Sequence, residues 1–412
     1  MVAALISKII GMIYKSPLSS LLGRESFACF QFAQNVYFIL LMIASFSIPQ
    51  AVSKIMSERI AFKRYRDAQR VFKGALLYAV IAGGIVALIC VFGASVLVPD
   101  SVANARLALQ MLAPTIFMSG ILGVFRGYFQ AYRNMMPTSI SQIVEQIAVA
   151  VVALLMANFM VHHFAGTGED TLQRWSAAGA TIGTGAGVTA ALLFMLFVYS
   201  VNRKTINRRI ARDKVSVDES YQQVMRNIVL IVAPIILSAF IYNVNGYING
   251  VMYTSISDFR GMDNSQVKVL YAEFGFFMTL INIPLTLAST APTSMIPEVS
   301  AHYATGDVKG AIEKINNATW ISMLISMPAS VGLAVLAKPV TSLLFPSTEG
   351  VAGQLMVLGV ITVILNSTSN ISNGVLQGIG RANVPMINAA ISLAVDVVFL
   401  AVLLFFTNTG IY

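Results

Sequence analysis

The sequence predicts an all-α protein that crosses a membrane many times, with its helices in two similar bundles around a central cavity. Three observations lead to this prediction. Of the 412 residues, 57% are hydrophobic and only 11% are charged, whereas a soluble domain carries about 25% charged residues. The apolar residues form runs of about 20, the length that an α-helix needs to cross a bilayer. A sequence pattern in the first half also recurs in the second half.

We expect about eleven membrane spans, separated by short polar loops. They cover residues 3–22, 28–53, 72–98, 106–131, 137–161, 176–201, 227–252, 269–297, 317–337, 351–379 and 386–407. We expect an amino-terminal six-helix lobe at 1–202, a basic cytoplasmic linker at 203–226 and a carboxy-terminal lobe at 227–412. The second lobe has five spans against six, so we expect it to lack at least one final helix.

The basic residues predict the orientation of the spans. With the amino terminus placed in the cytoplasm, 20 of the 27 Lys and Arg residues fall on the cytoplasmic side, as the positive-inside rule requires. The net charge of +9 is therefore explained by membrane topology, with an added attraction to anionic membrane lipids. We do not expect nucleic acid as a partner.

Two echoes between the halves predict an internal duplication. Gly127, Gln130 and Pro137 match Gly374, Gln377 and Pro385, and Arg133 matches Arg381. The offset is about 247 residues, and repeats at a fixed offset are typical of duplicated transporter lobes. A second echo, at an offset of about 243 residues, pairs Pro49, Ser57, Ala68 and Ala75 with Pro292, Ser300, Ala311 and Ala318.

The sequence holds no recognisable catalytic motif. It has no GxxxxGK[ST] phosphate loop, no CxxC pair and no HExxH metal site. The glycines from Gly183 to Gly187 lie inside an apolar span, where close helix packing explains them better than phosphate binding. We therefore expect no enzyme, no cofactor and no metal.

The stretch from Gly120 to Gln146 is the strongest candidate for function. It joins two spans through a short basic turn, and Arg126, Gln130 and Glu145 lie at or inside the membrane edge. Ionisable groups there are costly and are functional candidates by default. Ser141 and Glu145 are four residues apart and share a helix face. Arg126 has three interpretations: an anchor among lipid headgroups, a partner of Glu145 across the hairpin, or a contact to a substrate phosphate.

Polar residues inside other spans predict a hydrated cavity for a bulky polar substrate. Asn35 lies in the second span, Asn245 in the seventh, and Asp396 near the middle of the eleventh. Such residues are not needed for packing against lipid, and they usually face a bundle interior or water.

Three stretches carry a resemblance to a known family: SKIIGMIYKSPLSSLLG, IPQAVSKIMSER and FRGYFQAYRNMMPTSISQIVEQ. They resemble polysaccharide-biosynthesis exporters related to stage V sporulation protein B. These exporters are similar to the MurJ-type lipid II flippases of the multidrug/oligosaccharidyl-lipid/polysaccharide exporter superfamily. The resemblance runs from about Ser7 to the end of the chain.

The resemblance implies alternating access between two six-helix lobes in the plasma membrane of a bacterial cell. The implied substrate is a polyprenyl-pyrophosphate-linked glycan, such as a cell-wall precursor, and a coupling cation or the membrane potential would drive it. Family members bind the pyrophosphate with basic residues of the first helix, which implies Lys8 and Lys15 here. Family arginines on spans two and eight have no counterpart near Leu40 and Thr279, which favours another polyprenyl-linked glycan over lipid II.

Two other functions remain open. A cation-coupled drug antiporter of the same superfamily would use Glu145 and Asp396 as acidic coupling residues. A membrane scaffold without transport activity would not need the polar interior.

Overall fold

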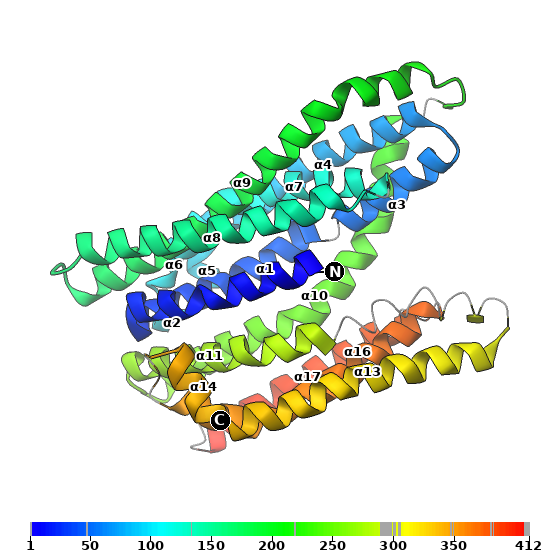
Figure 1. Cartoon of the computed structure of the whole chain (residues 1–412). Helices are drawn as coiled ribbons and strands as arrows, with labels where there is room; N and C mark the ends of the chain where they lie inside the picture. Colours follow the sequence, from blue (N-terminus) through cyan, green and yellow to red (C-terminus); the bar gives the residue numbers. More distant parts are fainter. Residues whose placement is uncertain are drawn as a thin grey trace. The chain divides into compact units, whose positions relative to one another are not determined.

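A computed structural model of the chain describes residues 2–46, 48–132, 134–217, 220–288, 299, 302–303, 306–346, 348, 350–379, 381 and 383–407. Within these residues the secondary structure is helical, as the sequence predicts (Figure 1). The first half holds α1 (Val2–Ile13), α2 (Lys15–Leu41), a π-helix (Met42–Phe46), α3 (Ile48–Ala61), α4 (Tyr65–Phe92), α5 (Ala94–Leu97), a 3₁₀ turn (Asp100–Val102), α6 (Ala105–Met111), α7 (Ala113–Ala131), α8 (Met136–His163) and α9 (Glu169–Ala211). The second half holds α10 (Tyr221–Phe259), α11 (Asn264–Ala288), α13 (Val308–Val335), α14 (Ala337–Leu344), α15 (Val351–Gly359), α16 (Ile361–Gly378) and α17 (Asn383–Phe406).

Eight helical stretches in the described residues are long and apolar enough to cross a membrane, and nine if bent α15–α16 forms one span. Expected spans one and two merge into a single stretch from Ile9 to Ser45. The expected span at 227–252 lies within α10, which has 39 residues. The chain is thus a multi-pass α-helical membrane protein, and the exact figure of eleven spans stays a prediction.

The chain forms two compact units, which we name by their larger segments. The amino-terminal unit contains Val2–Tyr14 and Cys29–Val251. The carboxy-terminal unit contains Lys15–Ala28 and Met252–Tyr412. Helices α2 and α10 therefore contribute residues to both units. The lobe boundaries expected at 203–226 differ from these limits and stay a prediction.

Helices α8 and α9 pack side by side in the amino-terminal unit (Figure 1). Gly183 and Gly187 allow this contact because neither has a side chain. A Cβ atom on Gly183 would lie 2.5 Å from the Ala153 side chain, and one on Gly187 would lie 2.7 Å from the Glu145 carbonyl oxygen. The helix-packing interpretation of these glycines is confirmed, since such distances leave no room for a larger residue.

The core of the amino-terminal unit lies where α3, α4, α7 and α9 meet. Ile55, Val71, Val124 and Ala191 are fully buried there. Phe72 of α4 packs against Tyr128 of α7 at a ring distance of 4.9 Å. Aromatic burial of this kind fixes the relative positions of the helices. The end of α7 and the start of the next turn are thus held rigidly.

In the carboxy-terminal unit an aromatic stack joins the middle of α2 to α11 and to the loop after α14. Phe276 lies 5.1 Å from Phe27 and 4.4 Å from Phe345, measured between ring centroids. The buried carboxylate of Glu273 accepts hydrogen bonds from the Thr348 hydroxyl at 2.6 Å and from the Ala352 backbone amide at 2.7 Å. An acidic group at a helix start satisfies amides that the helix itself leaves free.

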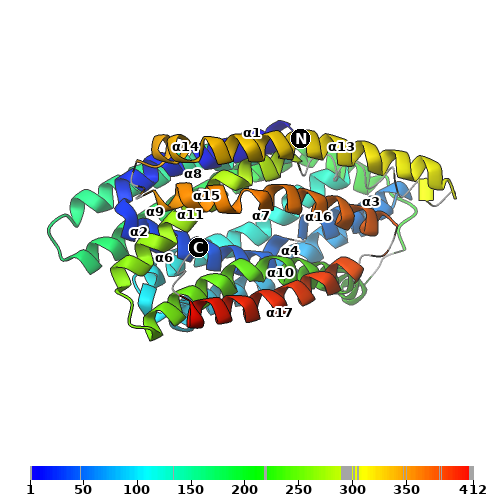
Figure 2. The same ribbon diagram turned by 90° about the horizontal axis from the view of Figure 1, so that it is seen from below.

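The starting positions of the helices repeat between the two halves. Helices α4 and α13 both have 28 residues and begin 243 residues apart. Helices α8 and α17 begin 247 residues apart, at Met136 and Asn383. The change in offset falls between α5 and α6 in the first half and between α14 and α15 in the second. Figure 2 shows α13 and α16, which pack against each other in the carboxy-terminal unit.

This repetition supports a duplicated fold and explains the two offsets. Ala68, Ala75, Ala311 and Ala318 of the second echo are all buried, each on the first turns of α4 or α13. Arg133, Pro292 and Ser300 lie outside the described residues, as does the side chain of Gln377. The superposition of the two halves stays a prediction.

Candidate functional site

The candidate site is built on the hairpin between α7 and α8. Pro137 lies in the first turn of α8, where its missing amide costs no helix hydrogen bond. The side-chain oxygen of Asn134 accepts from the Met136 amide at 3.2 Å and so satisfies the first amide of the same helix. The turn therefore fixes where α8 begins, and with it the height at which its polar residues face α7.

Arg126 of α7 is bound by two side chains of α8. Its Nη2 donates to Glu145 Oε2 at 2.6 Å, and its Nε donates to Ser141 Oγ at 3.0 Å. The Ser141 hydroxyl in turn donates to the Thr138 carbonyl oxygen at 2.7 Å. Ser141 and Glu145 thus share a helix face as their spacing predicts, and both contact the same guanidinium. Of the three interpretations of Arg126, pairing with Glu145 is the one that the structure shows.

The pair is mostly shielded, because the side chains of Arg126 and Glu145 are only 16% and 20% exposed. An ion pair in such surroundings contributes little net stability, but loss of one partner leaves a costly unpaired charge. The pair also neutralises Glu145, so that this face of α8 carries no net charge. The ion pair is suited to hold the hairpin together and to offer polar atoms to a neighbouring group.

Further polar side chains of the amino-terminal unit cross-link the helices around this hairpin. Gln34 of α2 donates from Nε2 to the Thr184 hydroxyl of α9 at 2.9 Å. Gln146 of α8 lies against Gly11 of α1, where a Cβ atom would be 2.8 Å from its side-chain oxygen. Helices α2, α8 and α9 thus all place polar side chains at contacts between helices of this unit.

The other residues predicted for the site lie on several helices. Lys8 is on α1 and its side chain lies outside the described residues, while Asn35 and Gln130 are on α2 and α7. Lys15 is the first residue of α2 and belongs to the carboxy-terminal unit. Asn245 on α10 and Asp396 on α17 each have a buried side-chain oxygen without a hydrogen bond among the described residues. Ion coupling by Glu145 and Asp396 stays a prediction. Substrate binding stays a prediction for all seven candidates: Lys8, Lys15, Asn35, Arg126, Gln130, Glu145 and Asn245.

Two features near the end of α9 were not predicted from the sequence. The first is a pocket between α9 and the end of α7, lined by Tyr128, Tyr132 and Arg209 among others. The second is a pair of buried carboxylates, Asp67 and Asp213, that holds residues 213–217 against α4. The order of residues from Asp213 to Ser216 is typical of a turn in which a carboxylate accepts from following amides, so this turn could have been found.

Comparison with known proteins agrees with this architecture. A solved structure of a multidrug resistance MATE family transporter of the MOP superfamily, in an inward-facing conformation, matches with a TM-score of 0.76. The match covers 98% of this chain and 88% of the transporter, at 15% sequence identity. A MOP superfamily transporter from Pyrococcus furiosus matches with a TM-score of 0.68 at 15% identity, over 99% of this chain and 88% of that one. These similarities show the fold.

Two curated relatives from Bacillus subtilis (strain 168) match along almost the whole chain. Lipid II flippase MurJ is 24% identical over 412 residues, which covers 95% of this chain and 74% of the relative. Stage V sporulation protein B is 24% identical over 417 residues, which covers 99% of this chain and 77% of the relative. A family model named MatE matches residues 269–402. The family model described as polysaccharide biosynthesis protein matches residues 1–302, and the chain therefore belongs to that family.

Proposed function

We propose that this protein is a flippase that moves a polyprenyl-pyrophosphate-linked glycan from the inner to the outer leaflet of a bacterial plasma membrane. The observation that carries the proposal is the near-full-length similarity to a lipid II flippase and to stage V sporulation protein B. The fold of two helical units, similar to known transporters, is consistent with alternating access. The positive-inside distribution of Lys and Arg supports a cytoplasmic amino terminus.

The substrate would need both a polar route and a cationic contact. A pyrophosphate cannot cross hydrocarbon unaided, and fixed cations supply charge-assisted hydrogen bonds to it. Arg126 is already engaged by Glu145. Lys8 and Lys15 are thus the better candidates for the phosphate contact. The polyprenyl tail would stay in the bilayer while the headgroup passes, and a coupling cation or the membrane potential would supply the driving force.

Replacement of Lys15 tests the proposal. We expect Lys15→Ala to abolish complementation of a flippase-depleted strain at normal membrane abundance, because the phosphate loses its cation. Lys15→Arg should keep part of the activity, since a flexible phosphate needs charge more than shape. Lys338→Ala is the matched control, because Lys338 is exposed at the start of α14. Normal growth of a Lys8→Ala, Lys15→Ala double variant at normal abundance would contradict the phosphate-binding role.

A cation-coupled antiporter is the second candidate function. The MatE match at residues 269–402 includes Asp396, whose Oδ2 is buried without a hydrogen bond among the described residues. A buried carboxylate of this kind can bind a proton or a metal cation. Glu145 suits that role less, because Arg126 already neutralises it. Undiminished growth of the double lysine variant would favour the antiporter.

A further inference from the structure

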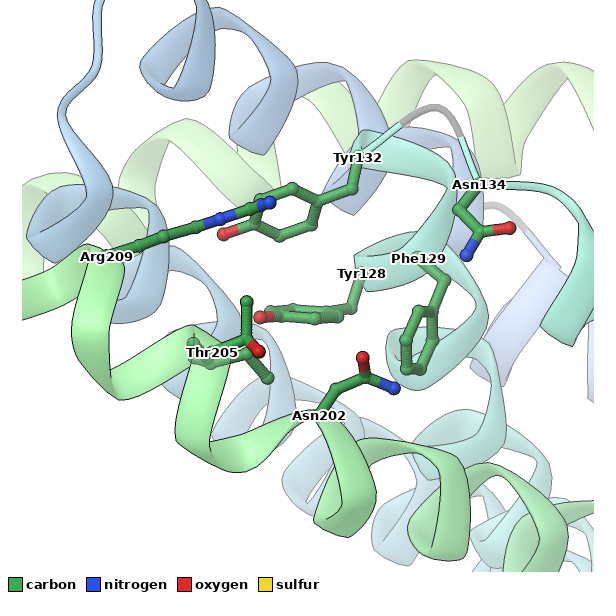
Figure 3. Close-up of a pocket in the computed structure, with 8 residues that line it drawn as sticks. Tyr128, Phe129, Tyr132, Asn134, Asn202, Thr205 and Arg209 are labelled. Atoms are coloured by element: carbon green, nitrogen blue, oxygen red, sulfur yellow. The ribbon is translucent and has the colours of Figure 1, made fainter.

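A pocket of about 210 Å³ lies where the last turns of α9 pass the end of α7 (Figure 3). Asn202, Thr205, Ile206 and Arg209 line one side of it. Their spacing of three, four and seven residues places them on one face of α9. Figure 3 shows Tyr128 and Phe129 of α7, and Tyr132 directly after it, on the other side. All these residues belong to the amino-terminal unit.

The aromatic side of the pocket is rigid. The Tyr128 ring is 1% exposed and lies 5.2 Å from the Tyr132 ring and 5.4 Å from the Tyr199 ring. The Tyr128 hydroxyl is buried and makes no hydrogen bond of good geometry with a described residue. It lies beside Tyr132, whose hydroxyl interacts with it electrostatically. The Tyr128 ring therefore forms a fixed aromatic wall of the pocket.

The opposite side of the pocket carries positive charge. The Arg209 guanidinium carbon lies 5.3 Å from the centre of the Tyr132 ring, close enough for a cation–π contact that holds the side chain over the pocket. No described carboxylate lies within ion-pair distance of Arg209. Arg208 and Arg212 on the same helix end are also exposed cations, and the nearby Asp213 is occupied by hydrogen bonds from Arg66, Val215 and Ser216. The pocket therefore favours an anion.

An apolar surface leads to the same pocket along α9. Phe197 is 66% exposed and Val201 is 65% exposed, and both lie in a helix that is long and apolar enough to cross the membrane. Thr205 follows Val201 by four residues and continues the same face into the pocket. A ligand that fits both surfaces has an apolar chain beside Phe197 and Val201 and a phosphate beside Thr205 and Arg209. A soluble phosphate compound would use only half of this arrangement.

We propose that this pocket binds the phosphate headgroup of an anionic phospholipid, with Arg209 as the main ligand and Thr205 and Asn202 as polar contacts. Basic pockets between membrane helices suit lipid phosphates, because an arginine can donate two parallel hydrogen bonds to them. The pocket would lie in the inner leaflet, and this placement rests on the proposed topology of the flippase. The binding itself is independent of the direction of transport, and the lipid here is a resident ligand, not the cargo.

Lipid retention by the purified full chain tests this proposal directly. Native mass spectrometry would count bound phosphatidylglycerol against phosphatidylcholine of the same acyl chains. We expect Arg209→Gln to weaken phosphatidylglycerol binding by about tenfold, because a hydrogen bond between charged groups is lost. Arg209→Lys should lose less, since the charge remains but the planar fork does not. Arg208→Gln is the matched control: it removes the same charge from the next residue, which does not line the pocket.

Equal losses in Arg209→Gln and Arg208→Gln would overturn the proposal, because they would show diffuse attraction to a basic helix end. Binding of soluble glycerol 1-phosphate as tight as that of the lipid would overturn it as well. Arg209 is exposed, so its replacement should leave the fold intact, and size-exclusion profiles of each variant would verify this. The measurement uses no transport substrate, so a failed flippase assay would leave its result unchanged.

Discussion

Arg126 and Glu145 show how two ionisable side chains can be stable within a membrane hairpin. Each would be costly alone, but together they form a short charge-assisted bond of 2.6 Å. The Ser141 hydroxyl accepts a hydrogen bond from a further donor of the guanidinium, Nε. The sequence spacing predicted that Ser141 and Glu145 share a face. It could not select among the three interpretations of Arg126, because the choice depends on how α7 and α8 are turned toward each other.

A conservative change tests the energetic role of this pair. Glu145→Gln leaves Arg126 partly buried without its counter-charge, so we expect a loss of about 2–3 kcal/mol in unfolding free energy in detergent. Asp100→Asn is the matched control, because it makes the same chemical change in the Arg106–Asp100 pair, where the Asp100 side chain is 91% exposed. An exposed pair should contribute less than about 1 kcal/mol. Equal losses in the two variants would contradict the structural role of the hairpin pair.

At the scale of elements, the segment after α9 is anchored to the start of α4. The Asp213 carboxylate accepts from the Arg66 backbone amide at 2.7 Å, and the Asp67 carboxylate accepts from the Val217 amide at 3.1 Å. Arg64 pairs with Asp67 at 2.7 Å. Each carboxylate thus binds the backbone of the other segment. This reciprocal contact fixes part of the basic segment that the sequence predicts as a linker.

Stability should depend on pH through Asp213. Burial alone would raise the pKa of this carboxyl, but hydrogen bonds from Ser216, Arg66 and Val215 outweigh it and hold the pKa well below its ordinary value. The folded pKa lies below the unfolded one, so the stabilisation is present above pH 4 or so and is lost as the pH falls through the folded pKa. We expect Asp213→Asn to cost about 2 kcal/mol at pH 7.

The difference in unfolding free energy between wild type and Asp213→Asn should shrink near pH 3, because the charged Asp213 carboxylate then stabilises the wild-type fold less. Asp258→Asn is a suitable control, since Asp258 is exposed at the end of α10. A difference that is the same at both pH values would show that the hydrogen bonds do not depend on the charge of Asp213.

The helices themselves were largely predictable, because apolar runs and loop charges set them. Helix α9 is the main exception, since it continues ten residues beyond the expected end at 201, to Ala211. Charged residues in that stretch predicted a linker, but Lys, Arg and Ile are also compatible with a helix. The pocket beside Tyr132 depends on this extension and could not be predicted without it. The anchor between Asp213 and α4 was likewise hidden, since its partners are about 147 residues apart in the sequence.

At the scale of the whole molecule, the repeated spacing of the helix starts carries information that sequence identity alone does not. An even number of spans between equivalent helices would keep their orientation, so the two halves would be related by an axis along the membrane normal. The lobes proposed at 1–202 and 227–412 follow from the same reasoning. Both proposals depend on which loops face the cytoplasm, and that can be measured loop by loop.

The last prediction concerns the topology of the chain in the membrane. The segments Lys54–Lys73 and Arg203–Arg226 should be cytoplasmic and the segment His163–Arg174 external, because 20 of the 27 basic residues then lie inside. Cys29 and Cys90 are buried, so a Cys29→Ser, Cys90→Ser background should tolerate single reporter cysteines. Ala165→Cys is an exposed external reporter, and Lys63→Cys is an exposed cytoplasmic one.

An impermeant maleimide added to intact cells should label Ala165→Cys and should reach Lys63→Cys only after the membrane is permeabilised. Each reporter is the control for the other, because both sites are exposed in turns between helices. Labelling of Lys63→Cys from outside would show that the topology is the reverse of the one proposed. It would place the pocket at Arg209 in the outer leaflet and would move the basic segment after α9 away from the anionic surface that is expected to attract it.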